Sequence, residues 1–160
     1  MQLELVEVDY HNATHAEHLV SLLNGYAMDP MGGDEPLSEY TRANLIEALQ
    51  KVPGAFSVIA YVDAKPAGLI NCFEGFSTFK CKPVINIHDV TVDAEYRGHG
   101  ISHKLLEKVE SIAKSRGACK LTLEVLEGNS VARASYQKFG FAGYELDPAM
   151  GKAEFWEKKL

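Results

Sequence analysis

A glycine-containing turn between a β-branched segment and an amphipathic segment constrains the fold more than any other feature of the sequence. Residues 84–92 (VINIHDVTV) are rich in β-branched side chains and predict a strand. A helix is predicted after Gly100 and ends at Gly117. Its apolar residues recur at helical spacing, namely Leu105, Leu106, Val109, Ile112 and Ala113. Because residues 119–125 predict a second strand, this order implies a parallel pair of strands joined by a right-handed crossover.

The remaining elements are predicted from the same kinds of pattern. Further strands are expected at residues 3–8, 56–62, 67–73, 141–144 and 153–158. Three further helices have start and end signals, at the capping box Thr14–Glu17, between Ser38 and Pro53, and from Asn129 or Ser130 to Gly140. The sequence therefore predicts a single α/β (α+β) domain over residues 1–160, with a central mixed, mostly antiparallel and twisted sheet of about seven strands flanked by four helices.

The charge and the cysteine content exclude several classes of protein. The chain of 160 residues has 16 Lys and Arg against 22 Asp and Glu, a net charge of −6. This balance argues against nucleic acids and anionic membranes as partners, and it weakly favours cationic substrates. Cys72, Cys81 and Cys119 are too few and too scattered for a disulfide framework or a zinc site, and their odd number suggests a reducing compartment. Without a signal peptide or an apolar run of membrane-spanning length, the expected location is the cytoplasm.

The turn Arg97-Gly98-His99-Gly100-Ile101-Ser102 is typical of anion binding. A helix N-terminus has unbonded N–H groups and a partial positive charge, glycines let the backbone approach a phosphate, and Arg97 adds a bidentate cation. We therefore predict a phosphorylated cofactor. A dinucleotide fingerprint requires a third glycine where His103 stands, although Glu124 lies at the distance of a ribose contact. A nucleotide-binding oxidoreductase is thus the weaker alternative.

Two motifs resemble those of the GNAT superfamily of N-acetyltransferases. The first is the run from Asp89 through Ser102, in which Arg97 and Gly100 match the pattern Gln/Arg-x-x-Gly-x-Gly/Ala and Ser102 stands where Gly or Ala is usual. The second is Asn129, Ala132, Tyr136, Gly140 and Phe141 at the family's spacing. The resemblance covers residues 84–144. It implies the acyl-CoA N-acyltransferase type of fold, with acetyl-CoA as the cofactor and CoA as the product.

The resemblance also implies direct transfer of the acetyl group to a primary amine of a small molecule or peptide. Tyr136 is then the general acid for the leaving thiolate, and Asn129 positions the cofactor or its own helix. A backbone N–H near Val90 or Val92 would hold the oxyanion. The full set of implied cofactor-binding residues is Val90, Thr91, Val92, Arg97, Gly98, His99, Gly100, Ile101, Ser102, Asn129 and Tyr136.

The general base and the acceptor site are less closely specified. Candidate bases are His88, Asp89 and Glu124, because imidazole exchanges protons near neutral pH and a carboxylate can act through water. The alternative for all three is that they are not catalytic and only form hydrogen bonds within the sheet. Candidate acceptor-binding residues are Asp29, Asp34, Glu35 and Phe73. His99 and His103 lack an acidic third ligand, so no metal is expected.

Two further expectations concern partners and activity. A non-catalytic acyl-CoA-binding regulatory module is the main alternative to an enzyme, and the presence of Tyr136 argues against it. Small enzymes with an open mixed sheet often form homodimers, although the sequence contains no interface pattern.

Overall fold

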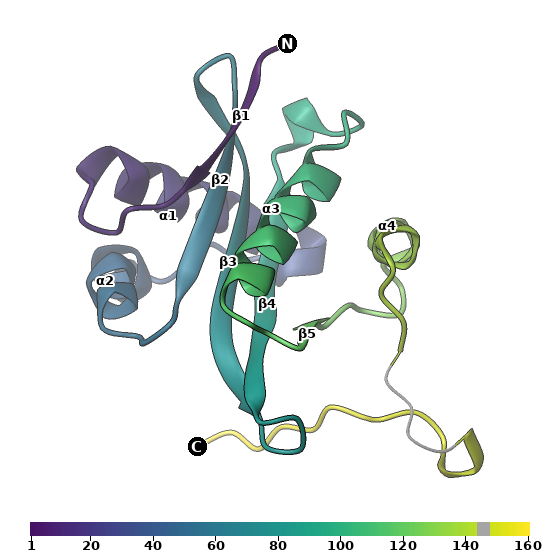
Figure 1. Ribbon diagram of the computed structural model, residues 1–160. Helices are drawn as coiled ribbons and strands as arrows, with labels where there is room; N and C mark the ends of the chain where they lie inside the picture. The colour runs from purple at the N-terminus through teal and green to yellow at the C-terminus, as the bar shows by residue number, and fades with distance from the viewer. Residues whose placement is uncertain (144–147) are drawn as a thin grey trace. The chain divides into compact units, whose positions relative to one another are not determined.

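The computed structural model describes residues 1–143 and 148–160, which divide into two compact units, Met1–Glu124 and Val125–Leu160. The first unit contains a five-stranded sheet with helices on both faces (Figure 1). The sheet order is β1 (Leu3–Glu7), β2 (Phe56–Val62), β3 (Lys65–Ser77), β4 (Lys82–Val92) and β5 (Lys120–Leu123).

The sheet is mixed and mostly antiparallel, as predicted. The first four strands pair antiparallel in sequence order, and β5 pairs parallel to β4. The β2–β3 hairpin closes through a two-residue turn at Asp63 and Ala64, both with positive φ (48° and 68°), a combination typical of a type I′ turn. The parallel pair confirms the prediction from the strand–helix–strand order of residues 84–125.

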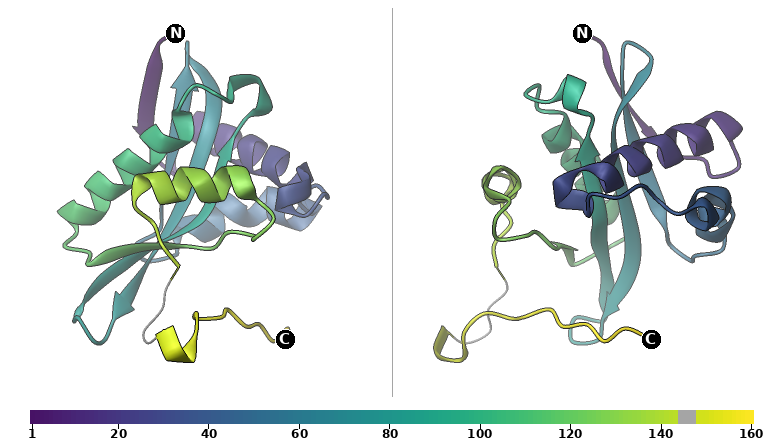
Figure 2. Two further views of the ribbon diagram at one scale, coloured as in Figure 1. Left: turned by 90° about the vertical axis from the view of Figure 1, so that its right-hand side faces the viewer. Right: turned by 180° about the vertical axis from the view of Figure 1, so that it is seen from behind.

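Two helices cover one face of the sheet and one helix covers the other (Figures 1 and 2). They are α1 (Ala13–Met28) and α2 (Glu39–Gln50) on one face and α3 (Ile101–Ser115) on the other. The predicted capping box at Thr14 is wrong. The N-cap of α1 is Asn12, whose side-chain oxygen accepts from the N–H groups of Thr14 and His15, so that Thr14 already lies in the first turn.

The core fills both spaces between the helices and the sheet. Against α1 and α2, the buried cluster consists of Leu19, Leu22, Leu49, Ile59 and Leu69. On the other face, the predicted apolar stripe of α3 is buried over the sheet except for Ile112, which is half-buried. At Gly68 a Cβ atom would lie 3.1 Å from Thr91 O and 3.3 Å from Ile101, so the absence of a side chain there lets α3 approach β3.

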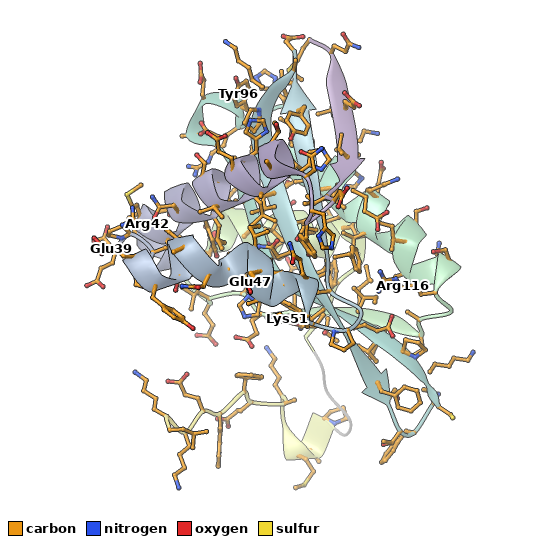
Figure 3. All side chains as sticks on the ribbon, turned by 90° about the vertical axis from the view of Figure 1, so that its left-hand side faces the viewer. Glu39, Arg42, Glu47, Lys51, Tyr96 and Arg116 are labelled. Atoms are coloured by element: carbon orange, nitrogen blue, oxygen red, sulfur yellow. The ribbon has the colours of Figure 1, made fainter. Side chains whose placement is uncertain are left out.

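Arg116 attaches the C-terminal end of α3 to the strands beneath it. Its guanidinium donates to Gly54 O at 2.8 Å, forms an ion pair with Glu74 at 3.1 Å and lies 4.5 Å from the centroid of the Phe56 ring. Figure 3 shows Arg116 well separated from the charged side chains of α2, such as Glu47, and from Lys51 at the end of that helix. These charged α2 side chains face solvent, with Glu47 and Lys51 forming an exposed ion pair at 3.4 Å.

The described residues of the second unit contain one α-helix, α4 (Ser130–Phe139), and a short 3₁₀ segment at Pro148–Met150. Asn129 is the N-cap of α4, and Gly140 ends it with φ 117°. The prediction of about seven strands is wrong, since the described residues contain five. At Phe141 the backbone N–H bonds to Tyr136 O, completing the helix end instead of a sheet ladder, and residues 153–158 are exposed without strand pairing. The last residue of the predicted strand 141–144 lies outside the described residues.

Among the described helices, none combines the length and the apolar character that crossing a membrane requires.

Candidate functional site

Among the described residues, the second half of β4 has a sheet neighbour on one side only. Pairing of β4 with β5 runs from Val84 opposite Lys120 to Ile87 opposite Leu123. Residues 88–92 continue beyond the end of β5, and residues 89–92 remain paired with β3 on the other side. The edge of β4 is therefore open over the segment for which the sequence predicts both a base and cofactor contacts.

The backbone groups of Val90 and Val92 point to this open edge. Asp93 N–H donates to Ala67 O on β3 at 2.8 Å. Because N–H groups alternate between the two sides of a strand, those of Val90 and Val92 point away from β3. Thr91 lies between them, opposite Leu69. The two amides that were predicted to hold an oxyanion thus have the orientation that this role requires.

The glycine turn leads from β4 into a helix that has no side-chain cap. Gly98 and Gly100 have φ values of 84° and 75°, and no atom lies within 4 Å of a Cβ built at either position. Side chains cap the other three α-helices of the described residues, whereas the N-cap of α3 is Gly100, with no side-chain hydrogen bond. The first helical bond runs from Lys104 N–H to Gly100 O at 3.2 Å. The backbone N–H groups that precede Lys104 in α3 have no partner within the helix, and such groups bind anions.

The side chain of Arg97 connects this turn to the end of α1. Its Nε donates to Val92 O at 3.1 Å, and its Nη2 lies 3.3 Å from Asp29 Oδ2. A guanidinium has five N–H donors, so these two contacts leave others for a phosphate. The pairing with Asp29 is a contact that the sequence pattern does not indicate, since the two residues are 68 positions apart.

Asp29 organises the loop that follows α1. Its carboxylate accepts from Met31 N–H at 2.9 Å, and its carbonyl accepts from the N–H groups of Gly32 and Asp34. The bond from Met31 holds the pKa of Asp29 below its usual value, Arg97 adds to this effect, and partial burial opposes it. The predicted acceptor residues Asp34 and Glu35 are exposed on the same loop.

His88 and Asp89 form a pair on β4. His88 Nδ1 lies 3.0 Å from Asp89 Oδ1, with the imidazole side chain 64% exposed and the carboxylate 17% exposed. The register slips by one residue here, because Asn71 pairs with Asp89 and Cys72 with Ile87, so His88 is the extra residue of a bulge. Phe73 packs against the core cluster and meets the His88 ring edge to face, with centroids 5.7 Å apart.

A row of polar side chains leads from Asp89 into the sheet. Asn71 Nδ2 donates to Asp89 Oδ2 at 3.1 Å, and Ser57 Oγ donates to Asn71 Oδ1 at 2.6 Å. Ser57 Oγ also lies 2.8 Å from the hydroxyl of Tyr10. Ser57, Asn71 and Asp89 are directly opposite one another in the register of three adjacent strands. Our sequence prediction missed Ser57 and Asn71, although each is a polar residue within an apolar stretch, residues 56–60 and 66–73.

Tyr26 is a second residue that the sequence prediction missed. Burial raises the pKa of its phenol, and the charges of Asp89 and Asp29 raise it further. Tyr26 belongs to α1, and its carbonyl accepts from the N–H of Asp29 at 3.0 Å, just beyond the end of that helix. Glu124, the third candidate base, is exposed and follows the end of β5.

The other predicted cofactor residues differ in their exposure. Ile101 is 2% exposed and belongs to the core, so only its backbone can serve the turn. Ser102 is half-buried and His99 is exposed. His103 Nε2 pairs with Glu107 at 3.2 Å along α3. Within residues 1–143 and 148–160, no group of three or more His, Cys, Asp or Glu side chains is arranged to hold a metal ion.

In the second unit, Asn129 and Tyr136 occupy opposite ends of α4. The side-chain oxygen of Asn129 accepts from Ala132 N–H at 3.2 Å, which establishes its role as a helix cap. Tyr136 is half-buried, and its ring meets that of Phe141 edge to face at 6.0 Å.

Comparison with known proteins gives matches over most of the chain. The model of the Acetyltransferase (GNAT) family matches residues 19–141. An uncharacterized N-acetyltransferase of Methanocaldococcus jannaschii is 33% identical over 89 residues, which cover 55% of this chain and 39% of that protein. Thialysine N-epsilon-acetyltransferase of Bos taurus is 37% identical over 65 residues, which cover 41% of this chain and 38% of that protein. The matched parts thus span about two fifths of the length of these relatives.

The fold is also found among solved structures. That of the aminoglycoside N-acetyltransferase AAC(6′)-Iy in complex with CoA superposes with a TM-score of 0.73 at 18% identity, covering 99% of this chain and 96% of that chain. At this level of identity the likeness establishes the fold alone.

Proposed function

Since the chain belongs to the GNAT family of acetyltransferases, we propose that it transfers an acetyl group from acetyl-CoA directly to a primary amine. The observation that carries this proposal is the uncapped N-terminus of α3, which follows the open edge of β4 through the positive-φ residues Gly98 and Gly100. The alternative of a nucleotide-binding oxidoreductase has no support from the family match.

The residues of the turn fit the pyrophosphate of the cofactor. Backbone amides at the start of α3 are suited to phosphate oxygens, the two glycines leave room for a close approach, and Arg97 supplies positive charge. The amides of Val90 and Val92 on the open edge of β4 are placed to bind the acyl end. Acetyl-CoA supplies the acetyl group as an activated thioester. Residues of the chain must bind it, remove the proton from the amine and protonate the leaving thiolate.

His88 is the general base of this proposal. An alkyl ammonium must lose a proton before it can act as a nucleophile, since at neutral pH about one molecule in two thousand is unprotonated. His88 is exposed on β4, beside the open edge, and Asp89 lies within hydrogen-bond distance of its Nδ1. The proton moves from the ammonium nitrogen to the imidazole, which later releases it to water.

Tyr136 on α4 is the proposed general acid. A phenol and a thiol have ordinary pKa values close enough for useful proton transfer to the leaving thiolate. This role requires that both units act together, so we also propose that residues 1–160 form one acetyltransferase domain. The expected result of Tyr136→Phe is a large fall in kcat with little change in the affinity for CoA.

The acceptor is proposed to be a small molecule or peptide with a cationic amine. The charges of Asp29 and Asp89 both act on the phenol of Tyr26 in α1, and Phe73 adds an aromatic edge beside His88. Two carboxylates with an aromatic wall are suited to an aliphatic ammonium group. The relatives named for thialysine, streptothricin and aminoglycosides suggest the amines to test first.

The experiment that tests the function combines binding and transfer. Thermal unfolding is measured with acetyl-CoA, CoA, NAD and ATP, each well above its expected Kd. A ligand at 100 times its Kd adds about 2.7 kcal/mol, which corresponds to a shift of roughly 5–10 °C for a chain of this size. Thiol release is then measured with the three amines above and with a peptide carrying a free N-terminus.

The outcomes separate the competing functions. Stabilisation by acetyl-CoA and CoA together with amine-dependent thiol release supports an acetyltransferase. Stabilisation without release from any amine supports a regulatory module that binds acyl-CoA. Stabilisation by NAD alone contradicts the proposal.

A further inference from the structure

Each hydrogen bond in the row Tyr10–Ser57–Asn71–Asp89–His88 has only one consistent direction. A carboxylate has no proton to donate, so both Asn71 Nδ2 and His88 Nδ1 must donate to Asp89. With its amide nitrogen committed to Asp89, Asn71 presents Oδ1 to the hydroxyl of Ser57, which donates to it. Because that donation uses the one proton of Ser57, Tyr10 must donate to Ser57 Oγ.

The direction of the row fixes the state of the imidazole. If Nδ1 of His88 carries the proton, Nε2 of the neutral ring is the acceptor nitrogen. We infer that Ser57 and Asn71 are positioning residues that hold Asp89 so that its Oδ1 keeps His88 in the Nδ1–H tautomer, with Nε2 directed to the acceptor amine. This inference rests on the proposed function of His88 as the general base.

The burial of the row argues against a purely structural role. Ser57 and Asn71 are 0% and 4% exposed among the buried apolar residues of β2 and β3, and burying a hydroxyl and an amide opposes folding unless each polar atom is satisfied. In this row every bond is made, and among the described residues no buried side-chain polar atom lacks a partner. The row nevertheless ends at an imidazole that is 64% exposed, on the bulged segment of β4.

Two other titratable groups, Tyr26 of α1 and Cys72 of β3, interact electrostatically with Asp89. Burial raises the pKa of the Cys72 thiol to about 12, and burial together with the charges of Asp89 and Asp29 raises the pKa of Tyr26. Both groups are therefore neutral near pH 7. Asp29, the second nearby carboxylate, is paired with Arg97.

The first test reads the tautomer directly, in the protein without substrates. Nitrogen-15 NMR of histidine-labelled protein distinguishes a protonated from an unprotonated ring nitrogen, and His88→Gln assigns the signal. We expect His88 of the unaltered protein in the Nδ1–H form above neutral pH. Ser57→Ala and Asn71→Ala are expected to convert it to a mixture with the Nε2–H form, because Asp89 loses its support.

The second test reads the same variants in steady-state kinetics. Asn71→Ala is expected to lower kcat about tenfold to a hundredfold, the range for losing a hydrogen bond to a charged group, while the KM for acetyl-CoA stays unchanged. Ser57→Ala, which removes one hydroxyl and creates little space, should have a smaller effect in the same direction. Because Ser57→Ala is the milder substitution, it can still be measured if the Asn71→Ala variant does not fold.

A matched control separates the row from the general effect of losing a buried phenol. Tyr61 lies in the same unit but outside the row, and its hydroxyl forms a hydrogen bond with His18 Nδ1 at 2.9 Å. Tyr10→Phe and Tyr61→Phe are the same chemical change, and only Tyr10→Phe should alter the His88 tautomer. An unchanged tautomer in folded Ser57→Ala and Asn71→Ala would overturn the inference. Absence of acetyl transfer by the unaltered protein would overturn the proposed function instead, and the NMR result would still decide the positioning.

Discussion

The glycine turn at Arg97–Ser102 and the polar row that ends at His88 belong to the proposed site but are built in different ways. The turn consists of consecutive residues, and the groups it offers are backbone amides at the start of α3. The row takes side chains from three strands, and Ser57 and Asn71 are buried within the sheet. Local chain geometry is sufficient for the turn, whereas the row exists only when the whole sheet has formed in register.

This difference predicts how each region responds to substitution. Around Gly98 and Gly100 there is open space, so a change there affects binding and local backbone strain but leaves the core untouched. In the row, removing one member leaves a buried polar partner unsatisfied, which affects both stability and the orientation of His88. Function and stability should therefore separate at the turn and remain linked along the row.

The largest effect is expected at the exposed end of the row. His88→Gln preserves hydrogen bonding but removes the proposed base, so we expect kcat to fall about 10²–10⁴-fold, the usual contribution of general acid–base catalysis. Because His88 is exposed and lies outside the turn, the thermal stabilisation by CoA should not change. Acetyl transfer is measured by thiol release. A kcat within twofold of the unaltered enzyme would exclude His88 as the base.

A smaller effect is expected at the turn, where a matched pair of glycines isolates binding from strain. Gly100 and Gly117 lie at opposite ends of α3, have φ values of 75° and 74°, and have no atoms within 4 Å of a built Cβ. Alanine at either position should lower the free energy of unfolding by about 1–2 kcal/mol through the same left-handed strain.

Only Gly100→Ala should also weaken CoA binding, by about tenfold, because its methyl group lies where the phosphate approaches. Isothermal titration with CoA and chemical denaturation of both variants measure the two effects separately. Equal CoA affinity in the two variants would show that the turn does not bind the pyrophosphate.

The same contrast explains what could be predicted from the sequence. The turn, the apolar stripe of α3 and the parallel strand pair follow from signals within one segment of chain, and the structure agrees with them. The row depends on contacts between residues 14 and 18 positions apart, whose register no local pattern determines. Asn12 and Thr14 are both good caps, so their competition could not be decided locally either.

The two C-terminal strands were predicted from short apolar stretches, which are ambiguous without a pairing partner. At Phe141 the end of α4 uses the backbone N–H instead, a requirement that the strand pattern does not reveal. The roles of Arg97, Asn129 and Tyr136 remain predictions that rest on the family. The interaction of Arg97 with Asp29 could not be foreseen because it joins distant segments.

The smallest expected effect concerns Asp29, which links the turn to the acceptor side. Asp29→Asn removes the charge that faces Arg97 and lies near Tyr26, while an amide retains most of the loop's hydrogen bonding. We expect the KM for a cationic amine to rise about twofold to fivefold, as for a partly screened charge, with kcat nearly unchanged. A neutral hydroxyl acceptor analogue used as a competitive inhibitor should bind both proteins equally.

The pH dependence of stability gives an independent measurement of the same charge. The pKa of Asp29 is lower in the folded protein than its usual value of 3.8, chiefly because Met31 N–H donates to the carboxylate, and Arg97 adds to the effect. The folded state therefore binds this proton less readily than the unfolded state, so the stabilising contribution is present above about pH 4 and is lost as the pH falls through the lowered pKa. Unfolding curves of Asp29→Asn and the unaltered protein should differ at neutral pH and converge below pH 4. If the difference between the two unfolding curves is as large in acid as at neutral pH, the substitution acts through altered loop packing. The charge of Asp29 would then not connect the turn to the proposed acceptor side.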